Sequence, residues 1–274
     1  MSENILEKII NKKRNKIKIL KKDVSISSLN DKISKLKNYV NFKEKILNNI
    51  NHDKISIIAE IKKASPSAGI IVKNYNPVEI ADIYLKNNVT CLSVLTEEDF
   101  FLGNLSHIYK IKSLINPMEQ PNPENHCIPI LCKDFFIDVY QVQLAKYYGA
   151  DAILIILAGV NERTADELYE EAEKLNMSVI VEVHTIDEAK KSLKYKDALI
   201  GINNRNLKTL KTNLNTTYDI HNILINHRGP LISESGIKSK EDVLKIASET
   251  KIKTFLIGES ILKNLENNNI FSIL

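Results

Sequence analysis

The chain has 274 residues, 43% hydrophobic and only 6% aromatic, with no tryptophan, so aliphatic side chains must fill any core. Its three cysteines, Cys91, Cys127 and Cys132, give neither a disulfide framework nor zinc-ligand spacing. No apolar run approaches the ~20 residues that cross a bilayer, and the N-terminus lacks a secretory signal. We therefore expect a cytoplasmic protein without a membrane partner.

The first 50 residues are strongly basic, with thirteen Lys and Arg against five Asp and Glu. Apolar residues recur at helical spacing in 3–22 and again in 35–49, which predicts two helices. The stretch 23–31, rich in Ser and Asp, indicates a turn with capping residues between them. We interpret residues 1–50 as a helical extension that raises the local potential for an anionic substrate.

From residue 55 onward, short apolar runs alternate with amphipathic segments. The predicted strands are 55–61, 91–96, 128–134, 152–157, 178–183, 198–203, 230–235 and 254–258. The predicted helices are 77–88, 105–115, 138–148, 161–175, 185–194, 214–225, 238–248 and 259–267. Eight such units predict an α/β fold, a (β/α)8 barrel, for residues 51–274. The competing doubly wound sheet typically has a Gly-rich turn after its first strand, and this chain has none.

Polar residues stand where most of the predicted strands end, and in a barrel those ends form the active site. They are Glu60, Lys62, Thr96, Glu97, Lys133, Asp134, Glu182, His184, Asn203, Arg205, Ser233, Glu234, Ser235 and Gly258. Any one of them alone reads as a solvated charge or a structural ion pair. So many ionisable groups are costly unless they share one polar cavity, so together they predict a single site. The segment 116–126 indicates an insertion at the opposite end.

Two of these strand ends carry a phosphate pattern. Ser235 and Gly236 follow the seventh strand, and Gly258 stands where the eighth strand turns into a helix. Backbone N–H groups at a helix start attract anions, and these two loops form the recurring phosphate site of this fold. With a hydroxyl from Ser65, the pattern predicts a sugar phosphate or a similar ester as substrate.

The remaining polar residues suit proton transfer. Lys62 and Lys133 fit a second anionic group and an acid role, and a lysine acts as an acid most readily when burial or a cation depresses its pKa. Glu182, at the tip of an apolar strand, fits a general base. We interpret His184 as a packing or helix-capping residue, because "HTIDEA" is typical of a helix start. We expect no metal and no cofactor; the residues alone leave the reaction unnamed.

The segment "IIAEIKKASPSAGII" (57–71) resembles the signature of the indole-3-glycerol phosphate synthase family. The likeness continues, in family order and one motif per strand, through "LSVLTEEDFFLG", "ILCKDFFID", "VIVEVH", "GINNRNL", "ISESGI" and "FLIGES". It covers residues 55–265, and the two predicted N-terminal helices resemble the extra segment of that family. Cys132 stands where the family has a larger residue, and its side chain should point away from the cavity if Lys133 points in.

The resemblance implies that the substrate is 1-(2-carboxyphenylamino)-1-deoxyribulose 5-phosphate and that the product is indole-3-glycerol phosphate, an intermediate of tryptophan biosynthesis. Lys133 would be the general acid for ring closure. Lys62 would hold the anthranilate carboxylate and serve in the later dehydration, in which Glu182 would be the base. Glu60 would be a second acid/base group, and Asn203 would bind substrate hydroxyls. Which lysine acts at which step stays open.

The same resemblance assigns the binding residues. Arg205 and Glu234 would support the charged network, and Phe101 and Phe135 would line the aromatic pocket. The phosphate would be held by Ser65, Ser235, Gly236, Gly258 and the amide of Glu259.

Three other functions fit the residues less well. A phosphoribosylanthranilate isomerase would need a Cys base at the first strand end, where none occurs. A non-catalytic phosphate-binding protein fits poorly, because every catalytic position holds a competent residue. A nucleic-acid-binding protein would use the basic run at 8–22, which lacks aromatic residues for stacking. We expect no nucleic-acid partner, and a monomer or weak homodimer.

Overall fold

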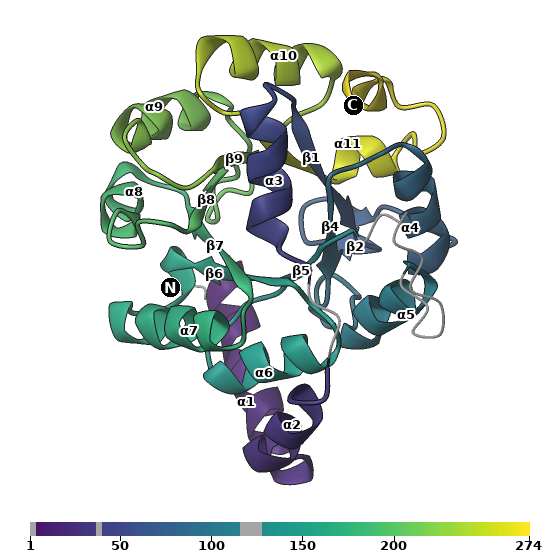
Figure 1. The fold of residues 1–274 in the computed structure, drawn as a ribbon, viewed down its shortest axis with the longest axis vertical. Helices are drawn as coiled ribbons and strands as arrows, with labels where there is room; N and C mark the ends of the chain where they lie inside the picture. The colour runs from purple at the N-terminus through teal and green to yellow at the C-terminus, as the bar shows by residue number, and fades with distance from the viewer. Residues whose placement is uncertain (1–3, 37–39, 116–127) are drawn as a thin grey trace.

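The computed structural model describes residues 4–36, 40–115 and 128–274, and eight parallel strands within them close into a barrel (Figure 1). They are β1 (Ser56–Ile61), β4 (Cys91–Leu95), β5 (Ile130–Lys133), β6 (Ala152–Ile156), β7 (Ser178–Val183), β8 (Leu199–Asn203), β9 (Leu231–Glu234) and β10 (Thr254–Ile257). Strand β10 pairs with β1 to complete the ring, with Thr254 beside Ser56. The predicted (β/α)8 barrel is confirmed, and each strand lies within two residues of its predicted range.

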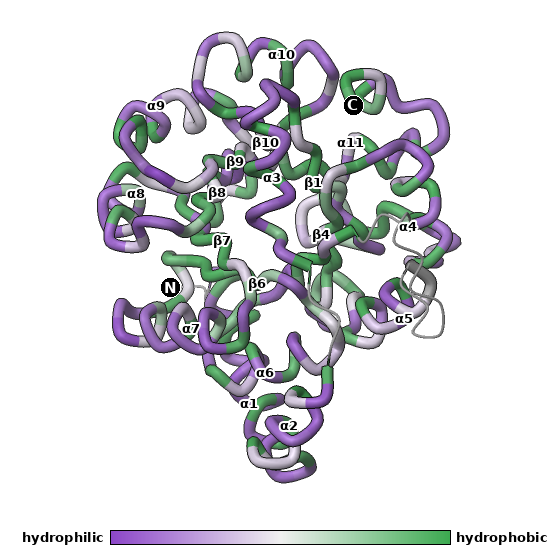
Figure 2. The backbone as a smooth tube through the Cα atoms, in the orientation of Figure 1, coloured by the Kyte–Doolittle hydropathy of each residue, from purple (hydrophilic) through white to green (hydrophobic). Residues whose placement is uncertain are grey.

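Helices surround the ring. They are α4 (Pro77–Lys86), α5 (Leu105–Ile115), α6 (Val139–Tyr147), α7 (Glu162–Lys174), α8 (Ile186–Ser192), α9 (Asn215–Leu224), α10 (Lys240–Glu249) and α11 (Glu259–Leu262). Figure 2 shows the strands mostly hydrophobic and the outward turns of helices such as α7 hydrophilic, as expected for strands buried on both faces and helices buried on one.

The prediction of a helix over 259–267 is wrong in length, because α11 ends at Leu262. Asparagine side chains explain the early end. Asn264 donates to the carbonyl of Asn267, and Asn268 donates to that of Ser260. Such local bonds compete with the helical ladder. A short 3-10 turn, η2 (Asn269–Ile273), follows and buries Ile270.

Alternation along each strand divides the core into two layers. In β1, Ile57, Ala59 and Ile61 pack under the helices, whereas Ile58 belongs to the cluster inside the barrel. Helix α3 (Phe42–Asn51) closes the amino end of the barrel with fully buried Phe42 and other apolar residues, and it crosses that end in Figure 1. Because apolar side chains fill this end, the polar residues of the inner face gather at the carboxyl end.

The N-terminal segment differs from the prediction in one element. Helices α1 (Ile5–Asp23) and α3 flank a further helix, α2 (Ile26–Ile33), where a turn was predicted. Ser25 caps α2 as expected of a helix start, and Leu29 and Ile33 are buried in a cluster with residues of α6. This tertiary burial outweighs the weak helix propensity of a Ser-rich stretch. Helix α3 also begins later than predicted, because Asn41 is its cap.

Within the described residues, no helix combines the length and apolarity needed to span a membrane. The predicted insertion at 116–126 and Cys127 lie outside the described residues. Cys132 is buried in the outer layer of the core, so the expectation that its side chain points away from the cavity is confirmed.

Asp151 ties three elements together at the amino end of the barrel. Its carboxylate, 3% exposed, accepts a bond from Lys112 Nζ of α5 at 2.5 Å. It also accepts from the backbone N of Ile130 at 2.8 Å and from that of Val40 at 3.3 Å. A buried charge with this many partners is costly to disrupt, because its partners remain desolvated.

We expect Asp151→Ala to lower the free energy of unfolding by about 3–5 kcal/mol, the usual cost of breaking a buried ion pair. Asp82 is the control, since it pairs with Lys86 on the exposed face of α4 and its replacement should cost under about 1 kcal/mol. Urea denaturation followed by circular dichroism measures both. Equal losses for the two variants would contradict the assigned role of Asp151.

Candidate active site

A cavity of about 640 Å³ opens at the carboxyl end of the barrel. All the residues to which the family resemblance assigns a role line it: Glu60, Lys62, Ser65, Phe101, Lys133, Phe135, Glu182, Asn203, Arg205, Glu234, Ser235, Gly236, Gly258 and Glu259. They meet because parallel strands bring their carboxyl ends to the same rim, and because alternation points every second side chain inward.

Lys133 is the central charge. Its Nζ, on β5, donates to Glu182 Oε2 of β7 at 2.9 Å and to Glu234 Oε2 of β9 at 2.6 Å. All three side chains are nearly buried. Burial lowers the pKa of Lys133, but Glu182, Glu234 and Glu60 outweigh burial and raise this pKa above its ordinary value. Without substrate, Lys133 therefore does not have the depressed pKa that favours an acid role, because the carboxylates crowd around the ammonium.

The two carboxylates differ in proton affinity. Burial favours the protonated form of both, but Lys133 and His184 hold the pKa of Glu182 well below its usual range. For Glu234, burial and the charge of Glu182 prevail over Lys133 and raise the pKa to about 7. Near neutral pH, one group is therefore an ionised base and the other carries a proton part of the time, a division typical of acid/base sites.

A glycine makes room for this cluster. A Cβ atom on Gly201 of β8 would lie 2.1 Å from Glu234 Oε1 and 3.0 Å from Ile180 Cγ2. A side chain at position 201 would therefore displace Glu234 from Lys133. The sequence pattern "GIN" marks a strand end but gives no sign of this steric role.

Lys62 and Glu60 form the second charged group. They stand two residues apart at the end of β1, so both point into the cavity, and Lys62 Nζ lies 2.5 Å from Glu60 Oε1. Gly258 leaves space for this pair, since a Cβ there would lie 2.6 Å from the same oxygen. Gly258 thus makes room for the carboxylate of Glu60, in addition to its predicted place in the phosphate loop.

The loops after β9 and β10 form the predicted phosphate end of the cavity. Ser235 and Gly236 both have positive φ, 66° and 80°, a conformation that favours glycine. Lys238 and Lys263 also line this end and were not singled out from the sequence. Their positions in loop and helix surfaces carry no motif, so only the fold identifies them as cations facing the cavity.

Arg205 shapes the neighbouring wall. Its Nη1 donates to the carbonyl of Leu210 at 2.9 Å, and its backbone bridges to Thr212. Asn203 Oδ1 accepts from the backbone N of Arg205 at 3.0 Å. This loop after β8 adds Leu207 and Leu210 to the cavity, so Arg205 organises the wall in addition to supplying charge.

The loop after β1 contains a small hairpin, β2 (Ala64–Ser65) and β3 (Gly69–Ile70). Ser65 Oγ accepts from the backbone N of Ala68 at 3.2 Å, which holds the hairpin turn at the cavity rim. Ser67 lines the cavity beside Ser65, their hydroxyls 3.3 Å apart. The hairpin therefore presents two hydroxyl groups where the sequence pointed to one.

The aromatic and aliphatic walls come from distant parts of the chain. The rings of Phe101 and Phe135 lie with centroids 6.0 Å apart. Leu6 and Ile9 of α1 face the same cavity, a contribution the sequence did not reveal. A Cβ on Gly159, after β6, would contact Leu6. The end of β6 lacks polar groups because α1 covers it.

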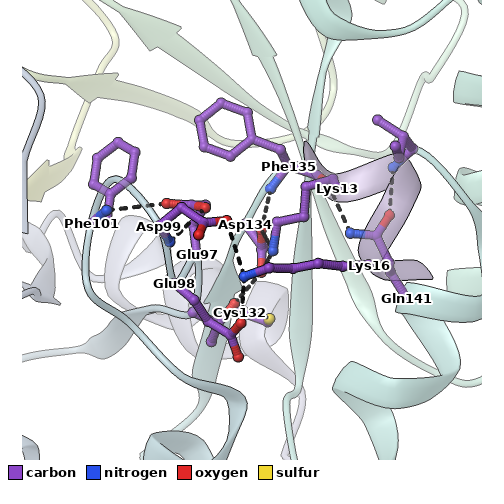
Figure 3. A network of polar contacts seen from close by, with 12 residues as sticks. Lys13, Lys16, Glu97, Glu98, Asp99, Phe101, Cys132, Asp134, Phe135 and Gln141 are labelled. Carbon is purple, nitrogen blue, oxygen red and sulfur yellow. Dashed lines mark hydrogen bonds and ion pairs between the residues drawn. The ribbon is translucent and has the colours of Figure 1, made fainter. Parts of the chain in front are cut away.

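Charged contacts fasten α1 to this rim (Figure 3). Lys13 Nζ lies 2.6 Å from Asp134 Oδ1, and the Lys13 side chain is only 11% exposed. Lys16 pairs with Glu98 and Asp99 on the loop that carries Phe101. The basic extension thus lies near the barrel mouth, as expected, but these two lysines are neutralised by acids rather than free to attract a substrate.

Not all the polar residues at the strand ends face the cavity. Glu97 accepts from the backbone N of Asp99, Phe100 and Phe101, and so shapes its own loop. Thr96 donates to Asp134, and Ser233 is bonded to Asn204 within the wall. These residues therefore stabilise local structure, which is the role that any one of them alone would indicate.

His184 is also absent from the cavity lining. Its ring is 7% exposed, with Nε2 3.2 Å from Glu182 Oε1 and Nδ1 3.4 Å from Glu188 Oε2. Burial lowers the pKa of His184, but the two carboxylates outweigh burial and raise it to about 9. The ring therefore adjoins a residue predicted to be catalytic without reaching the cavity itself.

Solved structures similar to this chain share its fold at low sequence identity. A protein of Aquifex aeolicus VF5 aligns with a TM-score of 0.57 and 14% identity, over 85% of this chain and 94% of the other. The tryptophan synthase alpha subunit of Legionella pneumophila str. Paris aligns with a TM-score of 0.57 and 11% identity, over 85% and 93%. These similarities confirm the barrel alone.

Sequence relatives are much closer. An indole-3-glycerol phosphate synthase of Prochlorococcus marinus subsp. pastoris is 42% identical over 98% of this chain and 88% of the relative. A tryptophan biosynthesis protein TrpCF of Buchnera aphidicola (Schizaphis graminum) is 41% identical over 98% of this chain and 55% of that longer relative. The sequence profile described as indole-3-glycerol phosphate synthase matches residues 6–273. With eight strands that deliver the acids, lysines and glycines of its motifs to one cavity, this chain belongs to the indole-3-glycerol phosphate synthase family.

Proposed function

We propose that this protein converts 1-(2-carboxyphenylamino)-1-deoxyribulose 5-phosphate into indole-3-glycerol phosphate, carbon dioxide and water, as a carboxy-lyase of tryptophan biosynthesis. Family membership supports the reaction. One observation carries it to this chain: Lys133 lies between two buried carboxylates of different proton affinity inside a cavity with cations at its rim. The reaction needs both proton donors and a proton acceptor, because the enzyme protonates substrate oxygens and removes a proton from the new ring.

The cavity suits a molecule with two anionic ends. Its volume of about 640 Å³ lies within the range of roughly 300–1,000 Å³ common for small-ligand sites. The phosphate would lie against the amides of Ser235 and Gly236, near Lys238. The carboxylate would face Lys62, and the aromatic ring would pack against Phe101 and Phe135. Arg205 and Asn203 lie between these ends, where the sugar hydroxyls would be.

Ring closure comes first. The ring carbon that bears the carboxylate attacks the ketose carbonyl carbon, and the carbonyl oxygen takes a proton from Lys133. An ammonium held by two carboxylates is a weak acid, so the substrate oxygen must replace one of them as acceptor before the proton moves. Glu234 is the better candidate to withdraw, because with a pKa of about 7 it can become neutral.

Two losses follow. The carboxylate leaves as carbon dioxide, and its bonding electrons restore the aromatic ring. The hydroxyl then leaves as water after accepting a proton, while Glu182 removes a proton from the new five-membered ring. Lys62, paired with Glu60, is placed at the same cavity to supply the proton for the hydroxyl. The two lysine–carboxylate groups thus match the two proton donations.

We also propose that the protein acts in the cytoplasm, as a monomer or weak homodimer, without cofactor, metal or nucleic acid. In the described part of the chain, Cys91 and Cys132 are buried free thiols, a state typical of a reducing compartment. The lysines of α1 that face the barrel pair with acids of the same chain, which supports a structural use of the basic segment rather than an external anionic partner.

Replacing the two central groups tests the proposed chemistry. We expect Lys133→Ala and Glu182→Gln each to lower kcat roughly 10²–10⁴-fold, the usual contribution of a general acid or base. The assay incubates protein with the carboxyphenylamino-deoxyribulose phosphate and follows indole fluorescence. Exposed Lys86 and Glu170 provide matched controls, as Lys86→Ala and Glu170→Gln, which should retain full activity. A silent wild type, or two active-site variants that match it, would refute the proposal.

A glycine substitution tests the phosphate end. In Gly236→Ala the new Cβ would lie 3.1 Å from Thr212 Cβ at a φ of 80°, so the loop must shift. We expect KM to rise roughly tenfold, as a loss of about 1.4 kcal/mol of binding does, with a smaller change in kcat. Gly149→Ala is the control, because Gly149 has a φ of 95° but lies outside the cavity. If both variants changed KM alike, general strain would explain the effect.

A further inference from the structure

His184 is a buried packing residue, as the sequence indicates, but helix capping does not explain the direction of its ring. The capping of α8 uses other atoms: Thr185 Oγ1 accepts from the backbone N of Glu188, and Glu188 Oε2 accepts from the backbone N of His184. Neither bond involves the imidazole ring. The ring nevertheless is 7% exposed and is directed between two carboxylates, so it needs a reason other than capping.

The surroundings require a charged ring. Both nitrogens face carboxylate oxygens, Nε2 toward Glu182 and Nδ1 toward Glu188. A neutral imidazole would place an acceptor nitrogen against one of them, whereas the imidazolium presents an N–H group to each. The charged groups about it are Glu182 of β7 and Glu188 of α8, with Lys133 of β5 and Glu234 of β9 on the far side of Glu182. The raised pKa of His184, about 9, agrees with this.

Glu182 therefore has a separate cation at each oxygen. Oε2 accepts from Lys133 at 2.9 Å, and Oε1 lies 3.2 Å from His184 Nε2. Nε2 is buried and makes no hydrogen bond to the described residues, so its contact with Oε1 is an ion pair that a small rotation would align. Catalytic hydrogen bonds commonly tighten in this way when substrate binds.

The two cations have different duties. Lys133 gives its proton to the substrate carbonyl oxygen, and the neutral amine is then no longer a cation beside Oε2 of Glu182. His184 does not line the cavity and has no substrate group to meet. We propose that His184 is a positioning residue: it keeps Glu182 ionised and oriented as the base while Lys133 acts on the substrate. This inference rests on the proposed function, since it assigns a support to the base of that reaction.

Two variants separate this role from a structural one. In His184→Gln the charge is lost at every pH. We expect the single-turnover rate of indole formation at pH 7 to fall roughly tenfold through lost orientation, with KM changed less than about twofold. The difference from wild type should shrink as the pH rises past about 9, because wild-type His184 then loses its own proton and its charge.

Glu188→Gln keeps the ring and its backbone acceptor but removes one carboxylate. The pKa of His184 should then fall from about 9 toward its ordinary value, so the ring loses its proton at lower pH. We expect wild-type rates near pH 6 and a roughly tenfold lower rate near pH 8, where wild-type His184 is still charged, because the neutral ring no longer orients Glu182.

The experiment measures single turnovers from pH 5.5 to 9.5 for wild type, both variants and Glu170→Gln, together with an NMR titration of the His184 ring. An inactive wild type would contradict the proposed function, and the titration would still report the charge of the ring. An active wild type with a Glu188→Gln profile that overlays its own, an equal loss in His184→Gln at every pH, or a ring that is neutral at pH 7 would each overturn the role of His184.

Discussion

The ion cluster around Lys133 is the constraint on which the rest of the structure depends. One ammonium and three carboxylates lie almost out of solvent at the mouth of a barrel packed with aliphatic residues. A buried charge is stable only when nearby groups of opposite charge or hydrogen-bond partners compensate it. Removing one partner leaves the others buried without compensation. The strands that carry these groups must therefore keep their register, because a shift of one residue would turn each charge toward the helices.

This constraint explains features that look unrelated. Gly201 has no side chain because Glu234 occupies that space, and Gly258 has none because Glu60 does. Helix α3 fills the amino end of the barrel interior with Phe42 and Ile46, so the polar residues of the inner face gather at the carboxyl end. Helix α1 covers the end of β6 and supplies the apolar wall that a substrate ring requires. The extension is thus part of the cavity rather than an appendage.

Charged groups of the same type have different roles in this structure, depending on their neighbours. Glu182 and Glu234 lie on either side of one lysine, yet Glu182 stays ionised and Glu234 titrates near neutrality. Two effects separate them: the cation of His184 lies next to Glu182 and not next to Glu234, and the charges of Glu182 and Glu60 raise the pKa of Glu234. Lys13 and Lys16 show the opposite use of charge, since they fasten α1 to acids at the rim and leave the attraction of substrate to other cations.

The sequence by itself determined the barrel and its strand order, because hydrophobic periodicity is a local property. Strand-end positions and family motifs also indicated most of the cavity residues, although Thr96, Glu97, Ser233 and His184 lie outside the cavity. The sequence could not reveal α2, which exists because Leu29 and Ile33 meet α6, nor the apolar wall from α1. Nor could it give the direction of the Lys133 pKa or the role of the His184 ring. Those follow from which charges become neighbours, and only tertiary structure brings residues from separate strands within a few ångströms of each other.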